Sequence, residues 1–211
     1  HGGPRRAPQA PPTLGAVPGK IKVTLSLPVE GEFRVSLPAW APGAYRIVNH
    51  AAQVRGLSAS DGDGRPLKVE AVDAQTWRVD GSGGGTARLT YEVVTEALRF
   101  DRDHCLIPGP ETFLYVVGRK DLPCRVRFVL PAGWKVGTGL DALPDGAYGA
   151  RDYDTFIDCP VELGRFELVT FEADGARYEL VIHAKGPPKA LLRFPGEGVN
   201  HTTPGGTRVS T

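Results

Sequence analysis

Four carboxylates stand close together in the run DYDTFIDCPVELGRF: Asp152, Asp154 and Asp158, followed by Glu162. A carboxylate that faces a cleft could receive a cation such as the α-amino group of a peptide through a charge-assisted hydrogen bond. The commoner alternative is a solvated acidic segment whose Asp side chains accept hydrogen bonds from their own backbone. A third hypothesis makes these groups the acid and base of a hydrolase, but such a pair needs environments that separate the two pKa values.

A second run, WAPGAYR, places Trp40 before Pro42 and Gly43, with Tyr45 after them. Pro presets φ and Gly accepts positive φ, so the spacing predicts a type II turn with the two aromatic rings packed on the core at either side. The functional alternative is a wall shared with a neighbouring domain, where Tyr and Arg are favoured contact residues.

The sequence contains no HExxH motif and no other set of metal ligands at a catalytic spacing. The run DRDHC at 101–105 crowds a carboxylate, an imidazole and a thiol together, but adjacent residues rarely converge on one ion. His50, His183 and His201 are isolated along the chain, and each is interpreted as a packed or solvated side chain. We therefore expect no catalytic residue, no metal and no cofactor on this chain.

Nucleotide-binding and hydrolase motifs are also absent from the sequence, including a P-loop, GxSxG and a GxGxxG that follows a strand. The glycine-rich run GSGGG at 81–85 falls between two strand-like segments, where it is interpreted as a hairpin connection.

Composition excludes some partners. Lys and Arg total 25 against 24 Asp and Glu, so a formal charge of +1 gives no field that would attract nucleic acid or an anionic membrane. No stretch approaches the roughly 20 consecutive apolar residues of a membrane span. The first 20 residues have no apolar run that could serve as a signal-peptide core. The compartment stays open between cytoplasmic and exported.

Three cysteines, Cys105, Cys124 and Cys159, are too few and too oddly numbered for a disulfide framework. Buried free thiols are the default interpretation. One oxidised pair is the alternative in an exported protein, because disulfides persist in oxidising compartments.

The elements that must position these residues are strands. The segment IKVTLSL alternates Ile21, Val23, Leu25 and Leu27 with polar residues, and FRVSL at 33–37 continues the period of two, so the pair is predicted to form a hairpin. A turn is predicted at DGDG, residues 61–64. If residues 155–158 form a strand, Pro160 ends it and Glu162 projects from the following turn.

At least eight such strands can be counted, and 27 Gly and 19 Pro interrupt nearly every window long enough for a helix. The fold class is therefore all-β, an antiparallel β-sandwich-like domain with little helix. The predicted organisation is a disordered leader at 1–20, a β domain at 21–186 and an irregular tail at 187–211.

The order of motifs along residues 21–186 resembles the N-terminal β domain of the glycyl aminopeptidase family of zinc metallopeptidases, thermolysin-like enzymes that often carry a PDZ domain. The motifs that carry this resemblance are WAPGAYRIVNHA, LSASDGDGRPLKVE, TWRV, TYEV, FLYVVG, LPAGWKV and DYDTFIDCPVELGRFE. The first and last of these are the specific ones.

The resemblance implies a domain that precedes an HExxH-bearing catalytic domain, with zinc held there, acting on peptides with a free N-terminal glycine or alanine. It implies a non-catalytic domain that packs on the catalytic domain and helps to bound the peptide cleft, and that is inactive alone. Contacts to substrate or to that domain are expected at Glu162, Asp158, Tyr45 and Trp40. The alternative is an independent β-sandwich module that binds protein or carbohydrate.

Overall fold

A computed structural model describes residues 13–17, 20–40, 49–81, 83–94, 99–100 and 103–183. Within these ranges the chain is built from strands, and the longest helix has six residues. The predicted all-β class is confirmed. No helix in the described part is long and apolar enough to cross a membrane.

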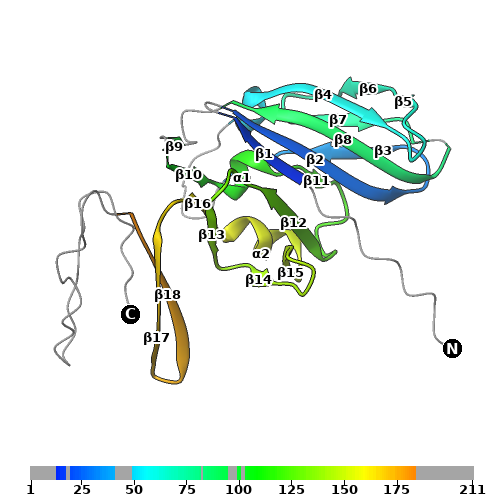
Figure 1. Ribbon diagram of the computed structural model, residues 1–211. Helices are drawn as coiled ribbons and strands as arrows, with labels where there is room; N and C mark the ends of the chain where they lie inside the picture. The colour runs from blue at the N-terminus through cyan, green and yellow to red at the C-terminus, as the bar shows by residue number, and fades with distance from the viewer. Residues whose placement is uncertain are drawn as a thin grey trace, which may run out of the picture.

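The largest sheet has eight strands in the order β14-β15-β12-β1-β2-β8-β4-β5 (Figure 1). Its long central strand β2 buries Ile21, Val23 and Leu27, as the alternation predicts, because successive side chains of a strand point to opposite faces. The strand bounds in chain order are β1 Thr13–Val17, β2 Lys20–Val29, β4 Val54–Ser60, β5 Pro66–Leu67, β8 Gly85–Val93, β12 Cys124–Val129, β14 Asp141–Ala142 and β15 Tyr148–Ala150.

A four-stranded sheet, β11-β3-β7-β6, lies against this large sheet. Its strands are β3 Phe33–Ser36, β6 Val69–Ala71, β7 Thr76–Val79 and β11 Tyr115–Val116. Buried side chains of both sheets form one apolar cluster, with Val35 and Val79 from the small sheet and Leu27 and Leu89 from the large one. Two sheets that share a core in this way form the predicted sandwich-like architecture.

Two predicted hairpins are wrong. The strands β2 and β3 follow one another but lie in different sheets, since β2 pairs with β1 and β8 whereas β3 pairs with β7 and β11. The glycine run at 81–85 likewise passes from β7 in one sheet to β8 in the other. A sandwich buries both inner faces only if the chain crosses between layers, and short periodicity carries no information about which connections cross.

A third sheet has the order β13-β16-β10-β9. Its strands are β9 Arg99–Phe100, β10 His104–Ile107, β13 Lys135–Thr138 and β16 Val161–Gly164. The hairpin of β17 (Glu167–Ala173) and β18 (Ala176–Ile182) follows β16 and extends away from the rest of the described chain in Figure 1. Its turn places Asp174 and Gly175 at φ of 50° and 76°, the left-handed values that a two-residue hairpin loop requires.

The described chain also contains three short helices, η1 His50–Gln53, α1 Gly109–Thr112 and α2 Tyr153–Asp158. The interpretation of residues 155–158 as a strand is therefore wrong. Asp152 accepts a hydrogen bond from the Thr155 backbone N–H at 2.7 Å and caps α2, while Tyr153, Phe156 and Ile157 are buried at helical spacing. The cap confirms that an Asp of the acidic run bonds its own backbone.

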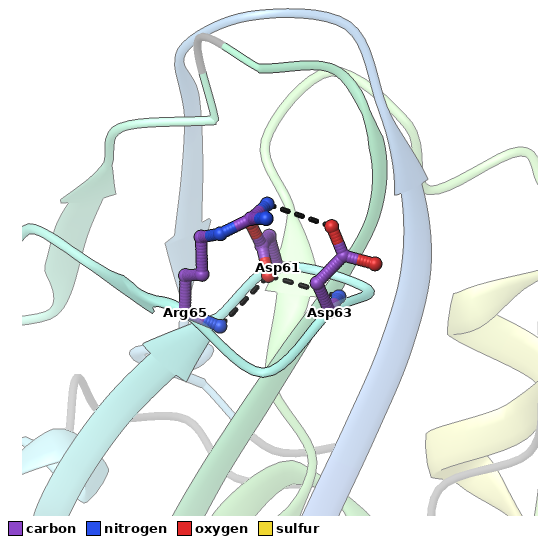
Figure 2. Close-up of polar contacts among 3 residues, drawn as sticks. All are labelled: Asp61, Asp63 and Arg65. Carbon is purple, nitrogen blue, oxygen red and sulfur yellow. Dashed lines mark hydrogen bonds and ion pairs between the residues drawn. The ribbon is translucent and has the colours of Figure 1, made fainter.

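The predicted turn at 61–64 is confirmed between β4 and β5 (Figure 2). The Asp61 carboxylate accepts hydrogen bonds from the backbone N–H groups of Asp63 at 2.9 Å and Arg65 at 2.8 Å. The Arg65 guanidinium also bonds the Asp63 carboxylate, at 2.7 Å. Such Asx turns let a side chain replace the missing backbone partners of a tight loop.

The strand β1 lies inside the segment 1–20 that the sequence predicts to be a leader. It pairs antiparallel with β2 and parallel with β12, for example Thr13 with Arg127. The other described strand pairs are antiparallel. The predicted tail at 187–211 lies outside the described residues.

Candidate functional site

Glu162 lies on β16, between β13 and β10, and not in a turn as predicted. Its neighbours in register are Gly137 on β13 and Leu106 on β10. Val161 and Leu163 point to the opposite side and are buried, which leaves Glu162 on the outer face of this sheet. The strand therefore presents the carboxylate on a rigid element.

His104 lies diagonally across from Glu162 on the same face. It stands opposite Gly164, which has no side chain, so the imidazole can lean toward Glu162, and its Nε2 makes a hydrogen bond with Glu162 Oε2. Gly164 is required there for a second reason. A Cβ at this position would lie 2.3 Å from the carbonyl oxygen of Asp103.

His183 reaches the same carboxylate from the hairpin. It directly follows β18, and its Nε2 lies 3.6 Å from Glu162 Oε2. Its ring centroid is 4.1 Å from that of His104 and 5.4 Å from that of Phe166. The hairpin can approach so closely because Gly137 leaves space, since a Cβ there would lie 2.5 Å from Val181 Cγ2.

The His104–Glu162–His183 cluster thus joins three segments that are distant in sequence. The three side chains are 20%, 28% and 31% exposed, so they are partly desolvated yet reachable from solvent. One nitrogen of each imidazole and one carboxylate oxygen all lie within 4.8 Å of one another. Each imidazole can form an ion pair with the Glu162 carboxylate. The nitrogen and oxygen donor atoms of the cluster are also of the types that bind zinc.

The other predicted site residues do not join this cluster by any hydrogen bond, ion pair or ring contact within the described ranges. Asp158 is exposed at the C-terminal end of α2, before Pro160 and Glu162 along the chain. Trp40 is 40% exposed, and the Lys120 ammonium lies 5.0 Å from its ring centroid. Tyr45 lies outside the described residues.

Lys120 contacts both Trp40 and residues of α2. Its Nζ also lies 5.0 Å from the Tyr115 ring, 5.5 Å from the Tyr153 ring and 2.9 Å from an Asp154 carboxylate oxygen. Asp154 therefore faces a lysine while Asp152 caps the helix, so the acidic run divides among separate tasks. A general acid and base that share one cleft do not arise from this arrangement.

All three cysteines are free. Burial raises the pKa of Cys105 to about 12, with a further contribution from the nearby Glu162 carboxylate. Burial also raises the pKa of Cys124 to about 12 and shifts that of Cys159 upward. Thiols held in the protonated form are poor nucleophiles, which agrees with the predicted structural role.

A cavity of about 50 Å³ lies in the core between the large sheet and α2, lined by residues that include Tyr91, Phe113 and Tyr153. Ligand sites of drug size occupy roughly 300 to 1,000 Å³. This cavity is too small for a peptide or a sugar. The zinc site of an HExxH enzyme does not fit this chain either, because the two histidines of that motif need a helix, and the sequence contains no HExxH.

Sequence reasoning missed the cluster because it treated His183 as isolated. The structure shows that His183 is 21 residues from Glu162 along the chain but adjacent in space. The sequence held one usable indication of the cluster. His104 and Leu106 alternate on one short strand, and Glu162 and Gly164 alternate on another. A correct prediction of the β10–β16 register would therefore have placed His104 and Glu162 on the same face.

Comparison with known proteins agrees with the fold. Residues 16–165 match the family described as the peptidase M61 N-terminal domain. A crystal structure of an aminopeptidase N family protein from Idiomarina loihiensis is similar, with a TM-score of 0.74 and 26% identity over 81% of this chain. The chain spans about 31% of the length of that protein. No curated protein matches. The chain belongs to the peptidase M61 N-terminal domain family.

Proposed function

We propose that this chain is the non-catalytic N-terminal β domain of a glycyl-aminopeptidase-like zinc metallopeptidase. The observation that carries the proposal is the family match over residues 16–165, which covers most of the β-sandwich and the third sheet. The domain packs on a catalytic domain that holds the zinc, and it helps to bound the cleft that receives the peptide. The partners are therefore that catalytic domain and the peptide substrate.

The β17–β18 hairpin supports an interdomain role. Cross-strand register places Val169, Phe171, Tyr178 and Leu180 on one face of the hairpin, and the rings of Phe171 and Tyr178 stack at 5.2 Å. Tyr178 is 39% exposed. An apolar stripe on a projecting hairpin is suited to burial against a neighbouring domain, and the similar aminopeptidase is about three times as long as the aligned region.

Trp40, Tyr45, Asp158 and Glu162 are the residues that we propose to contact the substrate or the catalytic domain, and Tyr45 lies outside the described residues. Trp40 is an exposed aromatic residue of the kind that is enriched at interfaces. Glu162 is the carboxylate proposed to receive the amino group of a substrate, a role that would use a charge-assisted hydrogen bond. The structure pairs it with His104, which an incoming amine would have to displace.

The proposal is tested with glycyl and alanyl arylamides. The purified chain with added zinc is expected to show no turnover, and activity that persists through repeated purification would contradict the non-catalytic role. In an enzyme that joins this domain to an HExxH domain, Glu162→Gln should raise KM for substrates with a free N-terminus. It should leave affinity for N-acetylated peptide inhibitors unchanged.

An independent protein- or carbohydrate-binding module is the alternative. The apolar hairpin stripe would serve a protein partner as well, whereas the small core cavity offers nothing to a sugar. Reading the nucleotide sequence downstream in all frames separates the two ideas. A segment that encodes an HExxH helix supports the peptidase domain, and its absence from the genome supports the module.

A further inference from the structure

We propose that His104, Glu162 and His183 bind one divalent transition-metal ion, with zinc as the best match, and that this ion fastens the β17–β18 hairpin to the third sheet. All three ligands belong to strands or strand ends of this chain, so the site needs no residue of another domain. It departs from the sequence expectation of no metal here.

The donor set favours zinc. Two imidazole nitrogens and one carboxylate oxygen form a combination that zinc accepts, with water in the fourth position. Magnesium and calcium prefer oxygen ligands throughout, so two histidines count against them. The set carries one negative charge when both rings are neutral, which partly balances a divalent cation.

The spacing also fits. Zinc bonds of roughly 2.1 Å in a tetrahedral site place ligand atoms about 3.4 Å apart. Glu162 Oε2 and His183 Nε2 are separated by 3.6 Å, and all three donor atoms lie within 4.8 Å of one another. His104 Nε2 and Glu162 Oε2 are in direct hydrogen-bond contact, so an ion that binds here replaces that hydrogen bond.

Paired strands fix the positions of His104 and Glu162 in the proposed site. His104 and Glu162 occupy paired strands on one face of the sheet. Gly137, opposite Glu162, leaves space for Val181 of the hairpin, and Gly164, opposite His104, avoids a clash with the Asp103 carbonyl oxygen. Phe166 lies beside His183 and is only 6% exposed, so one wall of the site is apolar. A partly dry wall strengthens metal–ligand electrostatics.

This role competes with recognition of a substrate amine by Glu162, because a divalent cation held at Oε2 repels an ammonium group. The two roles can be separated. Metal binding is a property of this chain alone and needs no catalytic domain, so it can succeed or fail independently of the proposed peptidase function.

The test is calorimetric titration of zinc chloride into the purified chain under reducing conditions at about pH 7.5, where unperturbed imidazoles are neutral. We expect one ion per chain and a higher melting temperature with zinc. Since loss of an outer-shell partner alone lowers affinity about 10- to 100-fold, Glu162→Gln and His183→Ala should each lower it at least about 100-fold. His201→Ala, a histidine outside the described residues, is the matched control.

Failure of the wild-type chain to bind zinc, or wild-type affinity retained in Glu162→Gln and His183→Ala, would overturn the proposal and leave an ion pair only. If a variant does not fold, the imidazole nitrogen resonances of the wild-type chain give the answer. Zinc should shift the His104 and His183 signals together. Shifts confined to His1, His50 or His201 would also overturn it.

Discussion

Tyr91 joins the large sheet to the C-terminal end of α1 and the segment that follows it through one hydroxyl group. Its oxygen donates a hydrogen bond to the Thr112 carbonyl at 3.0 Å and accepts one from the Leu114 backbone N–H at 3.1 Å. The side chain is 1% exposed, so water cannot replace these bonds. Burial raises the pKa of the phenol, which stays protonated and able to donate.

We expect Tyr91→Phe to lower the free energy of unfolding by about 1 to 3 kcal/mol, because two buried backbone groups lose their partner. Urea denaturation monitored by circular dichroism measures the change. Tyr178→Phe is the matched control, since Tyr178 is exposed on the hairpin. An equal effect of both substitutions would show that the Tyr91 hydroxyl contributes nothing specific.

His50 predicts a dependence of stability on pH. Burial lowers its pKa, against a smaller opposing effect of the Glu111 carboxylate. Because the unfolded state then binds more protons, the free energy of unfolding falls as pH drops below about 6.5, by at most about 1.4 kcal/mol per pH unit for this group.

His50→Leu removes this contribution. We expect the difference in stability between His50→Leu and the wild-type chain to be constant above about pH 7 and to shift in favour of His50→Leu at lower pH. Urea titrations at a series of pH values measure it. A difference that does not vary with pH would show that His50 titrates alike in the folded and unfolded states.

The hairpin of β17 and β18 packs on β13 at Gly137. Gly137 faces Val181, and Phe166 Cζ would lie 3.3 Å from a Cβ at this position. The close packing of the hairpin on β13, and with it the position of His183, therefore depends on the absence of a side chain at Gly137.

Gly137→Val should push β18 away from the sheet without removing any ligand of the His104–Glu162–His183 cluster. Hydrogen exchange measured by mass spectrometry should become faster across 176–183, and zinc affinity should fall. Gly139→Ala is the control, because a Cβ there would make an ordinary contact of 3.4 Å with Cys159 Sγ. Unchanged hydrogen exchange across 176–183 in Gly137→Val would contradict the close packing of β18 on Gly137.

Gly109 makes a second close approach, between α1 and α2. A Cβ at this position would lie 2.6 Å from the Ile157 carbonyl oxygen and 2.7 Å from its Cα, where only backbone could move. We expect Gly109→Ala to lower the free energy of unfolding by about 1 to 3 kcal/mol through overpacking. Gly62→Ala, whose Cβ would have 3.9 Å of space to Thr86, should have a much smaller effect in the same urea assay.

The elements themselves could be predicted to a useful extent. Alternation predicts the buried face of β2 because the side-chain period of a strand is local. Pairing is not local: Ile21 faces Val93, not a residue of the following strand. The helix α2 was missed because its six residues make fewer than two turns, too few for a helical period to show, and its signal was the Asp152 cap together with Tyr153 and Phe156.

For the molecule as a whole, the described chain combines a two-layer sandwich with a third sheet and a projecting hairpin (Figure 1). The candidate cluster depends on this arrangement, which sequence spacing alone could not supply. Glu162 was selected from the sequence for its motif. His104 and His183 were not, because their proximity follows from two tertiary contacts, one of strand register and one of hairpin docking.

The apolar stripe of the hairpin predicts self-association at high concentration, because exposed apolar surface that no neighbouring domain covers favours contact between copies of the chain. Light scattering should show a mean mass that rises with concentration, and Tyr178→Lys should reduce the rise. Thr170→Lys adds the same charge on the opposite face of the hairpin and is the control. A mass that stays monomeric at all concentrations would contradict the prediction.

The parallel pairing of β1 with β12 bears on how the chain folds during synthesis. Thr13 must wait for Arg127 before that seam can close, whereas the β17–β18 ribbon can form as soon as it leaves the ribosome. Until then, β1 can pair with β2, but its other edge lacks β12. Contacts of such long sequence separation form slowly, so this seam is where a nascent chain would be most exposed to mispairing and to chaperone capture.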